Sequence, residues 1–446
     1  MNETPVWKTL LKLSPPVMLA LLIQSVYNIV DSYFVARYAP EGLTALSLIF
    51  PIQLLMTAIA VGTGTGINIL ISRMEGTGDI RGEKNVEKSG LFLGVFNFSV
   101  FTFLGLLFLK PYCHISSSME LVRQYAFEYA QIILLLSFGM FVEAHCTKIL
   151  QAKRNMVLPM CAQVTGAIVN VILDPLLIFG SAHFPELGIR GAAIATVIGQ
   201  WIAMFLVLIP VLKEHPFSGK FTIHDCLRIY QSGLAAILTQ ALNTVYVIGL
   251  NLILKQFTED AVTVLGIYYK LQTFFFIPLF GLQQVVLPVI SYFYGAGNNK
   301  KIQQALRSSI LMGSSVMAVG FAVFLFFPKA LLGIFSSAPD ILSIGTTALR
   351  IISVSFIPAA FLIMFTVYFQ GVGRGSAGIA VTVFRQVFLL VPLAWLFHFF
   401  GLRAVWLTFP VTEFLSLSLC FYLYYEKKKH PASSLIQECP GAPAES

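Results

Sequence analysis

The side chains best suited to bind an ion or a proton in this sequence are an amide and a carboxylate one helical turn apart, Asn170 and Asp174. Residues four apart lie on the same face of a helix. The next residue, Pro175, has no backbone N–H to bond to the carbonyl of Val171. Amide, carboxylate and carbonyl oxygens therefore converge, which suits Na⁺ or an aspartate that takes up a proton. The alternative is a proline kink with a purely structural role.

Asp31 is the second candidate, deep in the apolar run 14–36. Gln24, Tyr27 and Asn28 precede it at spacings of three and four, which place these polar side chains on one helical face. A carboxylate near a bilayer centre costs about 2.5–3.5 kcal/mol, so its presence needs a reason. We predict a proton or cation site at Asp31, with Gln24, Tyr27 and Asn28 lining a cavity. The alternative is a structural carboxylate that bonds to its neighbours.

Three charged residues of the second half, Lys270, Arg385 and Glu413, also lie within apolar runs. Because an unpaired buried charge is unfavourable, we predict that Glu413 neutralises one of the two cations. The other cation would then line a wet cavity or pair with a substrate anion. Purely structural pairing is the alternative.

The elements that must position these residues are predicted to be membrane helices. The 446 residues are 57% hydrophobic and only 11% charged, with a mean hydropathy of +0.80. A bilayer core needs roughly 20 apolar residues per helical crossing, and the apolar runs have about that length. Membrane strands would instead alternate in segments of about 10 residues. The sequence therefore predicts an all-α polytopic membrane protein of about 12 transmembrane helices in two pseudo-symmetric six-helix bundles.

Polar breaks between the apolar runs set the expected boundaries. The N-terminal lobe is predicted over 1–212, a cytoplasmic linker over 213–231, the C-terminal lobe over 232–426 and a disordered cytoplasmic tail over 427–446. The predicted helices cover 14–36, 45–72, 90–110, 125–150, 158–180, 190–212, 232–255, 263–292, 306–328, 342–370, 376–398 and 402–425.

The two halves share a short pattern in the same order. Ile71-Ser72 with Gly76 and Gly78 recurs as Ile290-Ser291 with Gly295 and Gly297, and the same displacement carries Gln151 onto Gln370. With six helices per half, the repeats have the same orientation, an arrangement that transporters use to build a cavity between two lobes.

Charge placement predicts orientation and argues against nucleic acid as a partner. Lys and Arg concentrate in the loops on the side of the N-terminus, which favours both termini in the cytoplasm of a multi-pass protein of the bacterial inner membrane. The net charge of +8 is scattered and forms no basic stripe. Six cysteines show no paired spacing, so neither a disulfide framework nor a metal site is predicted from them.

Several segments together resemble the multidrug and toxic compound extrusion (MATE) family, most closely its bacterial MepA-like branch, within a larger flippase superfamily. The resemblance covers nearly the whole chain. It rests on residues 27–31, the loop after the second helix, 170–175, 188–196, 266–272, 294–297, 369–371 and 385–386.

The resemblance implies a secondary active transporter, not an enzyme, that exports small and often cationic organic compounds. It implies antiport with H⁺ or Na⁺ through a cavity that opens alternately to each side. Asp31, Asn170, Asp174 and Thr196 match the family's coupling-ion positions, with a possible Na⁺ at the first three. We expect no cofactor, and partners limited to the small-molecule substrate and the lipid bilayer around a monomer. Some members instead use acidic residues in helices seven and ten. In this sequence the seventh and tenth predicted helices contain no acidic residue.

The sequence bears on two other classes of function. A lipid-linked oligosaccharide flippase would want basic residues for a pyrophosphate, and Lys270 and Arg385 keep that alternative open. A membrane enzyme is disfavoured because the sequence has no HExxH or GxSxG motif. Gly62, Gly64 and Gly66 lack the strand and lysine of a phosphate-binding loop, so we predict that Gly62 and Gly66 serve close helix packing.

Overall fold

The computed structural model describes residues 5–180, 185–214, 219–336 and 338–429. Helices form almost all of these ranges, and no strand occurs in them, which confirms the predicted all-α fold. Within these ranges, ten helices are long and apolar enough to cross a membrane, and the number rises to 12 when each of two bent helix pairs is taken as one span. The chain is therefore a multi-pass membrane protein.

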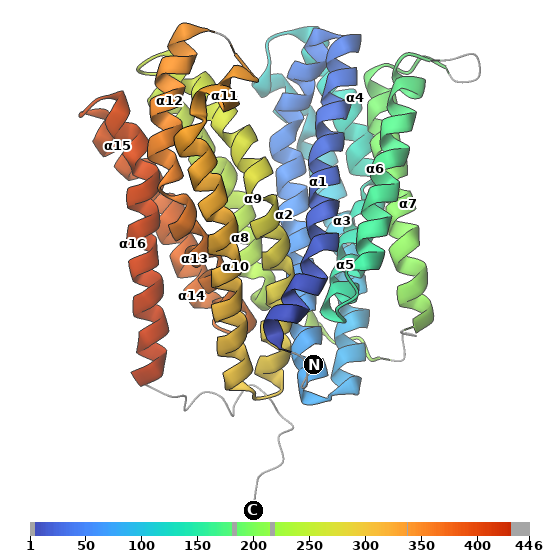
Figure 1. Cartoon of the computed structure of the whole chain (residues 1–446). Coiled ribbons are helices and arrows are strands. Elements are labelled where there is room, and N and C mark those ends of the chain that lie inside the picture. Colours follow the sequence, from blue (N-terminus) through green and yellow to red (C-terminus); the bar gives the residue numbers. More distant parts are fainter. Residues whose placement is uncertain (1–4, 181–184, 215–218, 337, 430–446) are drawn as a thin grey trace, which may run out of the picture.

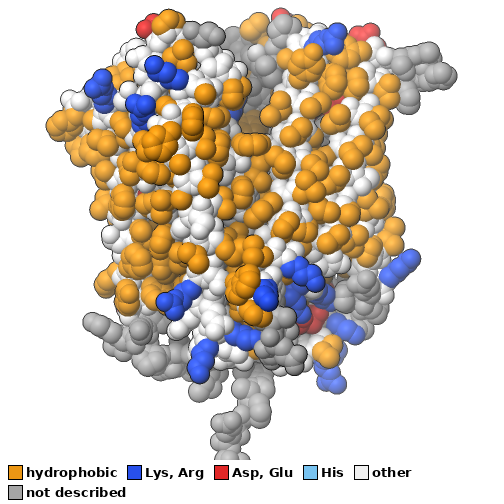
Figure 2. All heavy atoms as spheres, in the orientation of Figure 1, with side chains coloured by type: hydrophobic (Ala, Val, Ile, Leu, Met, Phe, Trp, Pro, Cys, Tyr) orange, Lys and Arg blue, Asp and Glu red, His pale blue; other side chains and the backbone are white. Residues whose placement is uncertain are grey.

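The first half contains α1 (Val6–Tyr38), α2 (Pro40–Thr77), α3 (Ile80–Ser116), α4 (Glu120–Leu136), α5 (Phe138–Ala152), α6 (Val157–Ile178) and α7 (Ile189–Glu214). The second half contains α8 (Ile223–Leu254), α9 (Glu259–Gly295), α10 (Asn299–Phe326), α11 (Pro328–Gly333), α12 (Pro339–Ser353), α13 (Phe356–Gly371), α14 (Gly375–Val383), the π-helical segment η1 (Phe384–Leu390), α15 (Val391–His398) and α16 (Leu402–Lys429). In Figure 1 the two halves stand side by side, and the first and last helices have their free ends at the same lower end. Figure 2 shows hydrophobic side chains over the middle of this face and more Lys and Arg at the lower end than at the upper end.

The fourth and tenth predicted spans are each broken at a serine. α4 and α5 bend by 49° at Ser137, and α12 and α13 bend by 47° beside Ser355. Each hydroxyl donates to the carbonyl oxygen three residues earlier, over 3.0 Å to Leu134 and 2.6 Å to Ile352. A side chain that bonds back to the helix in this way competes with the regular backbone ladder. The matching bends support the repeat relation between the halves.

Four helices begin earlier than hydropathy predicts. α3 begins at Ile80 and not near 90, α8 at Ile223 and not near 232, α10 at Asn299 and not near 306, and α1 at Val6 and not near 14. For three of them the reason is an N-cap: Asp79, Thr222 and Asn298 each accept a hydrogen bond from the backbone N–H three residues on. A search for apolar runs does not detect the polar first turn of a helix at the membrane surface.

The predicted linker 213–231 is correspondingly too long. α7 continues to Glu214 and α8 begins at Ile223, so residues 223–231 are helical, while 215–218 lie outside the described residues. Most of the predicted tail, 430–446, also lies outside them, and α16 extends to Lys429.

The lobes pack closely through α2, which contacts α8 and α9 of the other half. A Cβ atom at Gly66 would lie 2.0 Å from the carbonyl oxygen of Ile229, and one at Gly62 would lie 2.2 Å from the side chain of Ile237. Only glycine permits backbones this close, which confirms that Gly62 and Gly66 serve helix packing.

At the lower end of the bundle, Arg73 reaches from α2 to the end of α13. Its Nη2 donates to the carbonyl oxygens of Gln370 and Gly371, over 3.1 and 3.2 Å. A cation at the C-terminus of a helix satisfies its last carbonyls and its dipole. This contact joins the two lobes at the end that holds the first residues of α1.

Lys153 joins two carboxylates of α3 to the end of α5. Its Nζ lies 2.7 Å from Glu83 and 2.6 Å from Glu87, and the Glu87 side chain is only 4% exposed. We expect Lys153→Met to lower the free energy of unfolding by an amount between the ~1 kcal/mol of an exposed ion pair and the ~3–5 kcal/mol of a buried one.

Thermal unfolding of the purified protein measures this loss. Lys255→Met is the matched control, because Lys255 is 67% exposed and lies 3.9 Å from an exposed Glu259. Equal melting temperatures for the two variants would contradict a stabilising role for Lys153.

Candidate functional site

Asn170 and Asp174 lie on the face of α6 that packs against α7. Asn170 is 2% exposed and Asp174 is fully buried. The Asn170 Nδ2 donates to Asp174 Oδ1 and to the Thr196 hydroxyl of α7, both over 3.3 Å. The structure thus brings together three of the four residues predicted as a coupling-ion site.

Asp31, the fourth residue, comes from α1, which packs against α6. Asp31 and Asp174 are close enough for their charges to interact. Within the described residues, Asp31 Oδ1, Asn170 Oδ1 and Asp174 Oδ2 are all buried and have no hydrogen-bond partner. A buried oxygen without a partner is costly, and a carboxylate more so. A proton or a desolvated cation such as Na⁺ would satisfy this cluster, which we call the N-lobe oxygen cluster (Asp31, Asn170, Asp174 and Thr196).

Two residues around this cluster were missed from the sequence. Tyr129 of α4 is buried, its hydroxyl accepts a hydrogen bond from Gln53 Nε2 of α2 over 3.4 Å, and it also interacts with Thr196. Gln53 is a polar residue in an apolar run and could have been noted for that reason. Nothing in the spacing around Tyr129 distinguishes it from a core aromatic residue.

The other predicted residues of α1 lie differently. Tyr27 is half-buried and close enough to Asp31 for an electrostatic interaction with its carboxylate. Gln24 and Asn28 are exposed, and the described contacts join neither side chain to the N-lobe oxygen cluster. Their predicted role in lining a cavity stays a prediction.

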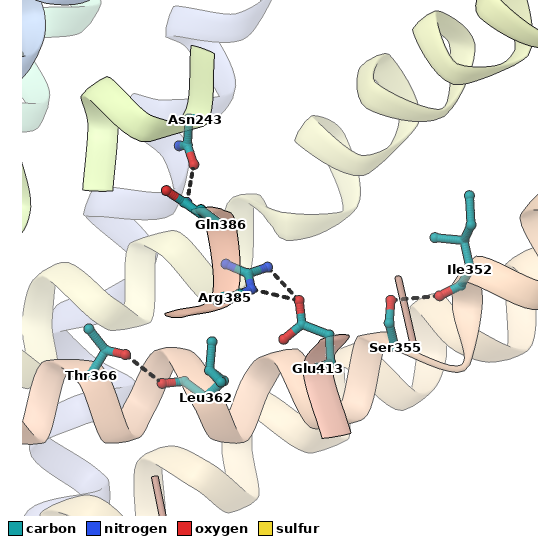
Figure 3. A network of polar contacts seen from close by, with 8 residues as sticks. All are labelled: Asn243, Ile352, Ser355, Leu362, Thr366, Arg385, Gln386 and Glu413. Atoms are coloured by element: carbon teal, nitrogen blue, oxygen red, sulfur yellow. Dashed lines mark hydrogen bonds and ion pairs between the residues drawn. The ribbon is translucent and has the colours of Figure 1, made fainter. Parts of the chain in front are cut away.

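In the C-terminal lobe, Glu413 of α16 neutralises Arg385 of η1. The Arg385 Nε donates to Glu413 Oε1 over 2.9 Å, and Nη2 donates to the same oxygen. The adjacent Gln386 turns the other way and donates from Nε2 to Asn243 Oδ1 of α8 over 2.6 Å. Figure 3 shows the two residues reaching toward different helices. This confirms the predicted pairing of Glu413 with a cation.

The prediction that Lys270 is buried is wrong. Lys270 is exposed on α9, and its Nζ lies 5.9 Å from the centre of the Phe335 ring, just beyond α11. A long aliphatic stem lets the ammonium group leave the apolar surface. The described contacts do not join Lys270 to Arg385, so the two cations do not form a shared site there.

One buried lysine, near the end of α5, bridges the lobes. The Lys148 Nζ of α5 donates to Gln151 over 2.9 Å and to Gln284 of α9 over 3.1 Å. A polar contact between lobes must break if the lobes separate at this point.

Comparison with known protein families identifies the family to which this chain belongs. A family model described as MatE matches residues 16–176 and 235–396, once in each lobe. The chain belongs to the MatE family. MatE proteins are membrane transporters and not enzymes, and the double match agrees with the repeat seen in the sequence.

Individual MatE relatives match over nearly their whole length. The "FAD transporter" of Shewanella oneidensis is 26% identical, with 94% of this chain and 95% of the relative covered. The "Multidrug export protein MepA" of Staphylococcus haemolyticus is 24% identical, with 95% and 94% covered. An outward-facing structure of a multidrug resistance MATE family transporter superposes with a TM-score of 0.88 at 23% identity, covering 96% of each chain, which shows the shared fold.

Proposed function

We propose that this protein exports small organic molecules from the cytoplasm by antiport with H⁺ or Na⁺, with both termini cytoplasmic. The observation that carries the proposal is the N-lobe oxygen cluster, where three buried oxygens have no hydrogen-bond partner among the described residues. Ionisable residues in a membrane interior, such as Asp31 and Asp174, are by default functional, because removing their charge from water is costly. A cotransported ion supplies the missing partner.

α1 supplies a physical link between this ion site and the lobe interface. Val6, Leu10 and Val17 in its first half belong to the large core of the C-terminal lobe, while Val35 near its end belongs to a core of the N-terminal lobe. Asp31 lies between them. An ion that binds Asp31 and Asp174 better in one arrangement of α1 shifts the population toward it. Alternating access then follows from repacking of α1 between the lobes.

Two substrate classes are supported by relatives. A multidrug exporter is among them, which favours drug-like organic compounds, and ethidium serves as the test compound of this class. A relative named as an FAD transporter favours a dinucleotide cofactor as the second candidate. The flippase alternative loses support, because the described contacts join Lys270 to neither Arg385 nor Glu413, so the two cations do not form one basic site for a pyrophosphate.

Efflux from proteoliposomes tests the proposal. Vesicles loaded with ethidium or with FAD receive an inward pH gradient, an inward Na⁺ gradient, or neither. A 100 mV difference supplies about 2.3 kcal/mol per charge, equal to an about 50-fold concentration ratio. We expect one gradient to drive uphill efflux of one of the two compounds. Efflux that responds to neither gradient would refute ion coupling.

A further inference from the structure

We propose that Arg385 and the cavity beside it bind an anionic group, a carboxylate or phosphate, of the transported molecule. The inference rests on the proposed export function and names a chemical class for its substrate. The cavity lies between α8, α9, α13, η1 and α16, and its polar lining includes Tyr246, Tyr268, Gln272, Arg385, Thr412 and Glu413.

The first support is the way Arg385 is held. Its Nε and Nη2 both donate to a single oxygen of Glu413, so the ion pair uses one edge of the guanidinium. Among the described residues nothing accepts a hydrogen bond from Nη1, and the side chain is 23% exposed. A guanidinium presents five donors in a planar fork that matches carboxylate and phosphate oxygens. One edge of that fork is left for a ligand.

The second support is the local backbone. η1 is a π-helical turn, and its wider turn points Arg385 toward α16 and Gln386 toward Asn243 of α8, as Figure 3 shows. π-Helical turns of this kind are frequent at functional sites. The bond from Gln386 to Asn243 anchors the turn, so the guanidinium is held in place before any ligand arrives.

The third support is the chemistry of the cavity wall. The cavity has a volume of about 20 Å³, enough for one water molecule or one ligand oxygen. Its lining includes Tyr246, Tyr268 and Gln272, whose hydroxyl and amide groups are able to donate hydrogen bonds. Thr412 is 1% exposed, and its hydroxyl has no partner among the described residues. The lining therefore combines residues that can donate hydrogen bonds with the positive charge of Arg385.

A cation at this place is the rival ligand. It is supported by Glu413 Oε2 and by the Thr412 hydroxyl oxygen, which are both buried and without a hydrogen-bond partner among the described residues. The charge of Glu413 is already engaged by Arg385, so a cation would have to compete with a guanidinium. An anion competes instead with Glu413 for Arg385, which makes opposite predictions for the removal of the Glu413 charge.

The test compares two fluorescent, water-soluble probes that differ by one phosphate, flavin mononucleotide and riboflavin. Binding of each to the purified full-length protein is measured by fluorescence anisotropy in neutral detergent. We expect the wild type to bind the phosphate-bearing probe at least about tenfold more tightly, because the group meets a charged donor. Arg385→Gln should reduce this preference to within about twofold, and Arg403→Gln, at an exposed arginine of α16, should leave it unchanged.

Glu413→Gln distinguishes the two ligand classes. It removes the competing carboxylate charge with little change of shape, so the preference for the phosphate-bearing probe should rise several-fold. If Glu413→Gln does not fold, the double variant Arg385→Gln/Glu413→Gln, which removes both charges of the pair, should bind both probes equally. A wild type without preference, a preference that survives Arg385→Gln, or weaker anion binding in a folded Glu413→Gln protein would overturn the proposal.

Lipid phosphate is the other source of the same chemistry. In nanodiscs of phosphatidylcholine alone and with added phosphatidylglycerol, probe affinity should be the same if the site takes a transported anion. Competition by phosphatidylglycerol that Arg385→Gln relieves would overturn the substrate assignment in favour of a lipid site. Binding is measured without a gradient, so the two proposals can fail separately. A missing preference for the phosphate-bearing probe would not affect gradient-driven efflux of ethidium, and a lack of ion coupling would not affect the probe preference.

Discussion

We expect Asp174→Asn to abolish ion-driven efflux while the protein still inserts and folds. Asp174 is fully buried and accepts a hydrogen bond from Asn170 through Oδ1, and its second oxygen has no partner in the part of the chain that the structure describes. Asparagine keeps the volume and one oxygen but removes the charge that would hold an ion. Since loss of a residue that only supports an ion ligand costs about 10–100-fold in affinity, loss of the ligand itself should cost at least about 100-fold. Gradient-driven efflux from proteoliposomes measures it.

The control is Glu259→Gln, which removes a carboxylate whose side chain is 79% exposed at the start of α9. It should transport like the wild type. Asp31→Asn should fail as Asp174→Asn does, with both variants retaining the elution volume of the folded protein. Normal uphill efflux in a folded Asp174→Asn protein would remove the N-lobe oxygen cluster from the mechanism.

Local spacing predicted the parts of this cluster that lie on one helix. Asn170 and Asp174 are four apart, and a helix of 3.6 residues per turn brings them together whatever surrounds it. Thr196 was reached only through family resemblance, and Tyr129 and Gln53 were not reached at all. Their contacts join α2, α4 and α7. The spacing of residues within one helix does not predict which other helices pack against it.

The C-terminal lobe shows the same limit. Burial of unpaired charge in lipid is costly enough that a partner for Glu413 could be predicted, but two cations were available. Arg385 was selected by the π-helical turn, one extra residue in a helix that hydropathy cannot register. Helix starts were missed for a related reason, because N-caps such as Asp79 lie ahead of the apolar run and carry no hydropathy signal.

The largest conformational effect is expected at Gly76 and Gly295, which lie against each other's helix at the junction of α2 and α9. A Cβ at Gly76 would lie 2.2 Å from the carbonyl oxygen of Tyr292, and one at Gly295 would lie 2.1 Å from that of Arg73. The two contacts are reciprocal, because the repeat that carries Gly76 onto Gly295 also carries Arg73 onto Tyr292. Both opposing atoms are backbone and have little room to move.

We expect Gly76→Ala to separate the lobes at this end and to slow export strongly. Overpacking costs about 1–3 kcal/mol, equal to an about 5- to 150-fold loss of the closed arrangement. Efflux assays measure the effect on transport. Closure itself is measured by maleimide labelling of Ser291→Cys, because Ser291 is fully buried beside this junction, and labelling should become faster when Gly76→Ala is added.

Gly266→Ala is the matched control, since a Cβ at this exposed position of the same α9 would meet nothing within 4 Å. It should change neither efflux nor labelling. Gly295→Ala, in contrast, should have an effect close to that of Gly76→Ala, because each methyl group would meet one carbonyl oxygen in equivalent geometry. If Gly295→Ala were harmless and Gly76→Ala were not, the closure could not be a symmetric contact of the two repeats, and a local fault in α2 would explain the loss instead.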